Sequence, residues 1–404
     1  MSQARAPAPP DLPARYPVPP KLLMGSAVAG AVGLVLTFVG MAISPQPALL
    51  AYLIAFVYWL GLAIGGVTLV LANHTAWAKW NVTVRRFNET AGAVIPLFIV
   101  LLIPLLLGAK HLWFWVAPVE PLSKEMHELL EHKRPYLNMG GFVIRAGVYF
   151  ICWTVLAWLL RAWSLRQDET GDPLLTARMR TLSPPGLVIF FLTFTFASFD
   201  WLMSLQPTWY STIFGLYVYA GAFIGSLAAL ALVVTGVRSS ASPLAAVISE
   251  DHQHNVGKLM LAFTCFWAYM AFSQYMLIWA GNLPEEVQWI VRRSQGVWRP
   301  VGILILLGHF VLPFFALLSR DLKRSAPALA AVAAWILVIH YVDLYWVVMP
   351  AVFETRLGLH WTHLTAFVGI GGVSVAGALA IFRAARPVPI RDPFLEESLR
   401  YVQP

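Results

Sequence analysis

Seven side chains with acid–base or hydrogen-bonding chemistry lie inside long apolar stretches of this chain. They are Arg145, Asp200, Gln274, Tyr275, His309, His340 and Asp343. An ionisable residue within such a stretch is energetically costly, and by default it marks a transport pathway, a proton relay or a buried pair. These residues are therefore the candidates for binding a small polar group or transferring protons.

Asp343 and His340 are three residues apart, so on a helix they share one face and are expected to meet. A carboxylate beside an imidazole favours the charged ring and fixes its tautomer. This spacing predicts a proton relay or a pair that hydrogen-bonds a quinol. The alternative is a structural pair that ties two helices together.

Arg145 and Asp200 are expected at similar depth in neighbouring segments, as an ion pair or as a contact to an anion or a quinone carbonyl. Gln274 and Tyr275 are able to hydrogen-bond a quinone ring, and equally able to join helices. His309 and His340 could ligate haem only as a pair on facing helices. No second histidine pair lies within the apolar segments, so no ligated cofactor and no metal site is expected.

The elements that carry these residues follow from composition. Of 404 residues, 59% are hydrophobic and only 12% are charged, whereas soluble proteins average about 25% charged residues. A soluble, disordered or disulfide-scaffold protein is therefore excluded. Ten apolar segments are long enough to span a bilayer, and each must be helical because lipid offers no partners to the backbone. They cover residues 22–43, 49–72, 90–108, 140–163, 185–205, 212–234, 257–280, 299–319, 326–348 and 362–382.

A weak repeat divides the ten segments. Gly61 and Gly65 in the second segment match Gly221 and Gly225 in the sixth, and each GxxxG motif opens a set of four spans. The expected fold is an all-α polytopic membrane protein with two four-helix bundles, helices 2–5 and 6–9, flanked by helices 1 and 10. The corresponding units are a flexible N-terminal tail (1–20), helix 1 (21–48), the bundles (49–211 and 212–350), helix 10 (351–383) and a C-terminal tail (384–404).

Charge sets the orientation. One set of loops with both tails carries 19 Lys and Arg residues and the opposite loops carry 8, which places both termini in the cytoplasm. The outer loops 109–139 and 281–298 are expected to form short amphipathic segments on the membrane surface. Apart from residues at the span ends, only Arg145, Asp200 and Asp343 are expected as charges inside the spans, all in the outer half, with the inner half almost free of charge.

Five motifs in order carry a family resemblance. They are the segments 138–145 (NMGGFVIR), 164–172 (SLRQDETGD), 198–205 (SFDWLMSL), 268–275 (AYMAFSQY) with 281–285 (GNLPE), and 340–350 (HYVDLYWVVMP). Residues 20–385 resemble the ActF subunits of alternative complex III. That family is similar to the ActC subunits and to the NrfD/PsrC membrane proteins.

The resemblance implies a membrane subunit of a bacterial quinol:cytochrome c oxidoreductase in the inner membrane. Quinol or menaquinol would be the substrate near the periplasmic face. The haems and iron–sulfur clusters would sit on partners, namely an ActC-like paralogue, an iron–sulfur subunit and multihaem cytochrome c subunits. The alternatives are a scaffold paralogue with a degenerate site and a secondary transporter, although the prolines within the spans do not pair across the repeat.

Overall fold

The computed structural model describes residues 15–119 and 121–403, and every regular element among them is a helix. Within this part, ten helices are long and apolar enough to cross a membrane, which confirms the predicted multi-pass helical class. Most of the predicted N-terminal tail, residues 1–14, lies outside the described residues. The ten spans are α1 (Pro20–Ile43), α2 (Pro45–Thr75), α3 with α4 (Val82–Ala93, Leu97–Leu107), α7 (Met139–Thr170), α8 with η1 (Pro173–Trp201, Met203–Leu205), α9 (Phe214–Arg238), α10 (Glu250–Gly281), α12 with η3 and α13 (Trp298–Ile305, Leu306–Val311, Leu312–Leu318), α15 with η4 (Ala326–Val348, Met349–Ala351) and α16 (Thr362–Arg383).

Local sequence signals set the helix ends. The Asn138 side chain caps α7 by accepting a hydrogen bond from the Gly141 amide at 2.7 Å. The same helix ends at Gly171, whose φ of 70° is the left-handed conformation that glycine adopts without strain. Asp172 then caps α8, which starts at Pro173, a residue suited to the first helical turn. The tight turn between α7 and α8 is thereby encoded locally.

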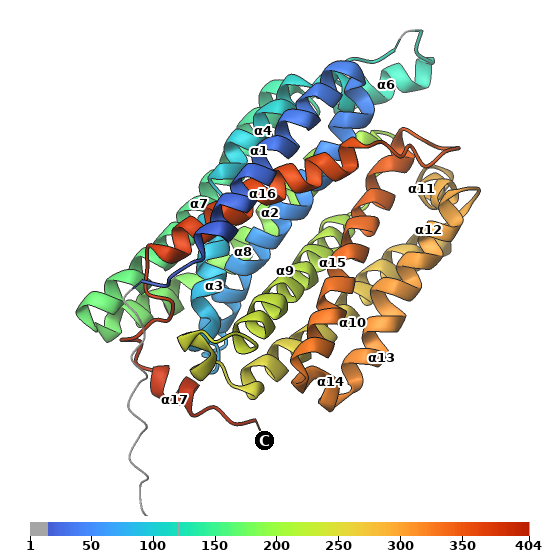
Figure 1. The fold of residues 1–404 in the computed structure, drawn as a ribbon. Coiled ribbons are helices and arrows are strands. Elements are labelled where there is room, and N and C mark those ends of the chain that lie inside the picture. The colour runs from blue at the N-terminus through green and yellow to red at the C-terminus, as the bar shows by residue number, and fades with distance from the viewer. Residues whose placement is uncertain (1–14, 120, 404) are drawn as a thin grey trace, which may run out of the picture.

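Short helices occupy the connections. The two long loops hold α5 (Ala109–Leu112) and α6 (Lys124–Lys133) in the first case, and α11 (Pro284–Ser294) in the second. Both loops thus contain the short helical segments that were predicted. The opposite end of the molecule carries η2 (Pro243–Ala246), α14 (Arg320–Arg324) and α17 (Leu395–Leu399). We refer to the two ends as the α11 end and the α17 end (Figure 1).

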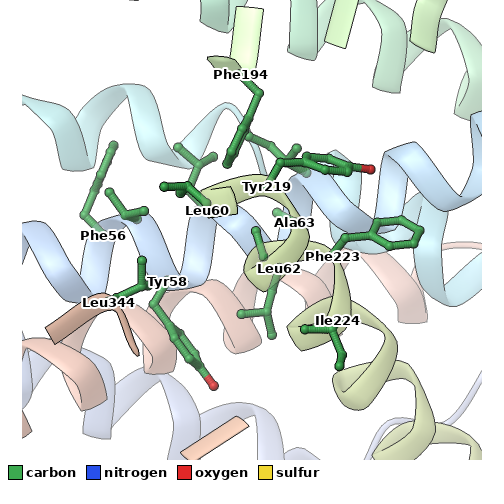
Figure 2. Packing of buried hydrophobic residues seen from close by; sticks show 14 of the residues in the cluster. Phe56, Tyr58, Leu60, Leu62, Ala63, Phe194, Tyr219, Phe223, Ile224 and Leu344 are labelled. Atoms are coloured by element: carbon green, nitrogen blue, oxygen red, sulfur yellow. The ribbon is translucent and has the colours of Figure 1, made fainter. Parts of the chain in front are cut away.

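The most buried span is α2, which packs against α3, α8, α9 and α16. Helix α9 contacts α2, α8, α10 and α15, so α2 and α9 form the centre of the molecule. Helices α1 and α16 pack closely along each other at the periphery. Figure 2 shows the apolar side chains of α2 and α9 that fill this centre, together with Phe194 of α8 and Leu344 of α15.

The glycines of the two GxxxG motifs face different neighbouring helices. A methyl group on Gly61 would lie 2.9 Å from Ala222 Cβ, and one on Gly65 would lie 2.5 Å from Ser226 Cβ. The glycines of α2 therefore allow α9 to approach closely. The glycines of α9, Gly221 and Gly225, instead face His340 of α15.

The third, fifth and seventh spans begin seven or more residues earlier than predicted, at Val82, Pro173 and Glu250. Helix α3 starts at Val82, and it carries a buried charged group near the α17 end. Arg86 pairs with Glu89 at 2.7 Å and with Asp168 of α7 at 2.6 Å, and Arg85 pairs with Asp392 at 2.8 Å. The spans thus carry buried charges in the half nearest the two tails, where the sequence predicted almost none. Charged residues were assigned to a loop because burying them costs desolvation energy. Here the ion pairs among them offset that cost.

The C-terminal tail packs back onto the α17 end. Besides the Asp392 ion pair, the Ile390 amide donates to Asp168 at 3.0 Å, and Ser398 Oγ donates to the Trp80 carbonyl at 2.7 Å. Ser398 is fully buried and Asp392 is 6% exposed. Residues 384–403 are consequently part of the folded body.

Candidate functional site

Asp343 is the centre of a buried polar cluster built from four helical spans. Its carboxylate accepts hydrogen bonds from the Tyr217 hydroxyl of α9 and from Trp267 Nε1 of α10, the latter at 3.1 Å. His309 Nδ1 of η3 lies 3.7 Å from its Oδ2 atom. Asp343 itself is 3% exposed. A buried carboxylate requires partners of this kind, because an unpaired one costs several kcal/mol.

A π-helical turn places His309 beside the carboxylate. Residues Leu306–Val311 form η3, and Pro313 follows it. Because Pro313 has no amide hydrogen, the α-helical bond to the His309 carbonyl cannot form. Such π-turns widen a helix locally and occur often at functional sites. The turn directs the imidazole inward, where it packs on Trp267 with 4.1 Å between ring centroids.

His340 lies in a slot between α9 and α2. Methyl groups on Gly221 and Gly225 would each lie 3.0 Å from carbons of the imidazole, and the ring of Tyr58 stacks on it at 5.3 Å. His340 forms no hydrogen bond with Asp343, so the predicted pairing of these two residues is wrong. His309 is the imidazole that approaches the carboxylate, at 3.7 Å and without a hydrogen bond, and the two imidazoles lie 6.0 Å apart.

Neither imidazole has a hydrogen-bonding partner. Both ring nitrogens of His309 and of His340 are buried and unpaired in the described part of the chain. Buried polar atoms are generally satisfied by protein or by ordered water. The cluster therefore has unused hydrogen-bonding capacity at both imidazoles.

A cavity of about 780 Å³ adjoins the cluster. It lies between α10 and the span formed by α12 and η3, from Arg299 to Phe310. Residues of α11 line the end of the cavity at Arg299. Its volume lies in the range of sites for small organic ligands. Tyr217 and Trp267, the two donors to Asp343, also line it. A ligand in the cavity is thus one side chain away from the buried carboxylate.

Two buried polar atoms of the cavity wall have no partner in the described structure. They are Oε1 of Gln274, a residue 4% exposed, and Nε1 of Trp346. One is an acceptor and the other a donor. Most of the remaining lining is apolar or aromatic, including Phe272, Leu306 and Phe310. The cavity therefore matches an apolar molecule with a few hydroxyl or carbonyl groups.

Arg145 and Asp200 form a separate site. The guanidinium of Arg145 donates to both carboxylate oxygens of Asp200, at 2.9 Å and 2.8 Å, and the Tyr149 hydroxyl donates to it at 2.8 Å. Arg145 also covers the ring of Tyr136, 3.9 Å from its centroid. Burial, reinforced by the nearby Asp200 charge, raises the pKa of Tyr136. Both oxygens of the Asp200 carboxylate thus accept hydrogen bonds from protein side chains. Such an arrangement fits the alternative in which the two residues form a structural ion pair.

The seven predicted residues thus fall into three groups. Asp343, His309 and His340 form the cluster, and Gln274 and Tyr275 line the adjacent cavity. Arg145 and Asp200 lie apart from both, between α7 and α8.

Four further residues escaped the sequence analysis. Tyr217, Trp267 and Trp346 resemble ordinary apolar core in an aromatic-rich chain, and Arg293 lies in a loop. Arg293 is 2% exposed, lies over the Trp289 ring at 3.9 Å and donates to the carbonyls of Trp346 and Val347. Burial lowers the pKa of Arg293, which has no carboxylate partner among the described residues. Its four-residue spacing from Trp289 on an amphipathic helix was the available signal.

No family model matches this chain, and no curated protein matches it. The geometry of the cluster and its cavity therefore carries the functional argument.

Proposed function

We propose that this protein is the membrane subunit of a quinol-oxidising complex, and that it binds quinol in the cavity between α10 and α12. In this proposal it belongs with the ActF and NrfD/PsrC proteins that its motifs resemble. The observation that carries the proposal is that the wall of a mostly apolar cavity holds two unsatisfied polar atoms, Gln274 Oε1 and Trp346 Nε1, with Asp343 directly behind the cavity. A quinol presents hydroxyl groups on an apolar ring, which is what such a wall accommodates.

The proposed architecture is two four-helix bundles. Helices α2, α3, α7 and α8 contact one another in a closed ring, as do α9, α10, α13 and α15. Helices α1 and α16 flank them. The resemblance implies a bacterial inner membrane, and the loop charges favour both termini in the cytoplasm. The α11 end would then face the periplasm, and the cavity would open near that face.

Proton transfer is the chemistry that Asp343 would supply. Quinol oxidation releases two protons and two electrons, and a positioned carboxylate accepts a proton as a general base. The Tyr217 hydroxyl, which lines the cavity and donates to Asp343, can pass its own proton to the carboxylate while receiving one from the ligand. His309 is the next acceptor, 3.7 Å from the same carboxylate.

The electrons would leave through partner subunits. The resemblance implies iron–sulfur and multihaem subunits for this task, beside an ActC-like paralogue. In the described residues, no group of three or more His, Cys, Asp or Glu side chains is arranged to hold a metal ion. This chain's proposed share is binding the quinol, orienting it and accepting its protons.

The experiment is calorimetric titration of the protein in lipid nanodiscs with short-chain benzoquinol and naphthoquinol. Gln274→Leu should weaken binding by about three- to tenfold, because it removes the acceptor on the cavity wall. Gln288→Leu, at an exposed position of α11 outside the cavity, is the matched control and should bind as wild type. The proposal is overturned if neither quinol binds, or if Gln274→Leu and Gln288→Leu bind quinol with equal affinity.

A scaffold role is the second candidate for part of the molecule. The Arg145–Asp200 pair has its hydrogen bonds satisfied within the protein and does not line the large cavity. The α7–α8 side is thus built as a structural clamp. Both roles are compatible, because they use different helices.

A further inference from the structure

We propose that the end of the cavity nearest α11 is a binding site for the headgroup of an anionic phospholipid, held by Arg299. The site lies at the rim of the cavity, where α12 begins at Trp298. One acyl chain would run along the lipid-facing side of α12, against Ile303 and Leu306. These two side chains are 49% and 56% exposed.

The charge at this rim is positive and uncompensated. Arg299 is exposed, and no hydrogen bond or ion pair engages it within the described residues. Arg293 adds a second, buried cation whose donors are directed at carbonyls. Among the described residues that line the cavity there is no Asp or Glu. The neighbouring Arg292, in contrast, is neutralised by Glu354 at 2.9 Å.

The apolar surroundings favour a membrane lipid over a soluble anion. Tyr269 and Phe272 are 63% and 61% exposed on the α10 side, and Leu306 and Leu307 are exposed on the α12 side. Such side chains belong in contact with acyl chains. An anionic phospholipid would place its phosphate next to the Arg299 cation and its acyl chains against the exposed apolar side chains. One ligand would thus account for both the charge and the apolar surface at the rim.

The arrangement in depth separates the lipid from the proposed quinol. Arg299 and Phe310 are about 16 Å apart along the helix, and both line the cavity. Trp346 lies beside Gly302, three residues after Arg299, and Tyr217 of the same lining donates to the buried Asp343. The lipid would form the missing outer wall of the cavity. This inference does not depend on quinol binding, and its test contains no quinol.

The test measures lipid retention by native mass spectrometry. The full-length protein is placed in nanodiscs that contain mainly phosphatidylcholine and a minor share of phosphatidylglycerol, and the lipids retained after release are counted. Arg299→Gln should lower retained phosphatidylglycerol relative to phosphatidylcholine by about fivefold, the effect of one basic residue near a membrane surface. Arg299→Lys keeps the charge and should stay within about twofold of wild type.

Lys110→Gln is the control, because Lys110 is an exposed cation of α5 in the other long loop and does not line the cavity. It should leave the ratio unchanged. The proposal is overturned if Arg299→Gln retains as much phosphatidylglycerol as wild type, or if Lys110→Gln loses as much. Displacement of the lipid by excess inorganic phosphate would also overturn it, since it would show a simple anion site that needs no acyl chain.

Discussion

His309, and not the nearby His340, lies beside the Asp343 carboxylate, with 3.7 Å between Nδ1 and Oδ2. The π-turn before Pro313 creates this contact between η3 and α15. Tyr217 and Trp267, which line the cavity, donate hydrogen bonds to the same carboxylate. The cavity wall is thus hydrogen-bonded to Asp343, whereas the imidazoles of His309 and His340 have no hydrogen-bonding partner among the described residues.

The first prediction concerns Asp343→Asn. The amide retains the shape of the carboxylate but does not accept a proton at neutral pH. Under the proposed function, quinol oxidation by the protein with its partners should therefore fall about 100-fold or more. Turnover and proton release are measured together in the same preparation. Glu285→Gln, at an exposed position of α11, is the control and should be unaffected. Unchanged turnover of Asp343→Asn would remove this residue from the mechanism.

The second prediction concerns the glycines that hold His340. Gly221→Ala places a methyl group 3.0 Å from the imidazole, and overpacking of this kind costs about 1–3 kcal/mol. Gly236→Ala, on the same helix, meets nothing within 4 Å and should stabilise α9 by about 0.5–1 kcal/mol. Opposite shifts of the thermal midpoint in detergent are therefore expected. Equal shifts would show that the slot around His340 is not tight.

The sequence predicted the spans well because lipid imposes one rule on every segment. Apolar runs near bilayer length had to be helices, and the ten observed spans follow. The start of α3 was misplaced because Arg85, Arg86 and Glu89 looked like loop residues. Their partners, Asp168 and Asp392, come from distant parts of the chain.

The site was predicted in its residue types more than in its contacts. Scarcity of charge identified Asp343 and both histidines, yet the spacing rule paired Asp343 with the wrong imidazole. Pro313 was the signal for a local change in helical geometry. Tyr217 and Trp267 had no signal at all, because aromatic side chains in a membrane span usually pack as core.

The third prediction separates the Arg145–Asp200 pair from the cavity. Arg145→Met leaves the fully buried Asp200 without its cation and should cost about 3–5 kcal/mol of stability. Asp200→Asn should cost less, since the Arg145 side chain is 22% exposed whereas that of Asp200 is fully buried. The double variant should recover much of the loss. Quinol affinity should not change in variants that remain folded, and a tenfold change would place the pair in the binding site.

As the control for this pair, Arg134→Met removes a salt bridge to Glu131 in which both side chains are more than half exposed. Its effect on the thermal midpoint should be small, because exposed pairs contribute about 0–1 kcal/mol.

The fourth prediction concerns the C-terminal tail. Arg85 and Asp392 have side chains only 3% and 1% exposed, and their ion pair joins α3 to the tail. Asp392→Asn leaves the Arg85 charge with Glu89 alone and should destabilise the α17 end by about 3 kcal/mol. Glu397, in the same tail, forms a half-exposed ion pair with Lys79. Glu397→Gln removes this pair and should lower the free energy of unfolding by less than about 1 kcal/mol. Because the tail detaches more readily in Asp392→Asn, carboxypeptidase should digest it faster than in Glu397→Gln, and equal digestion rates would show that the buried pair does not hold the tail.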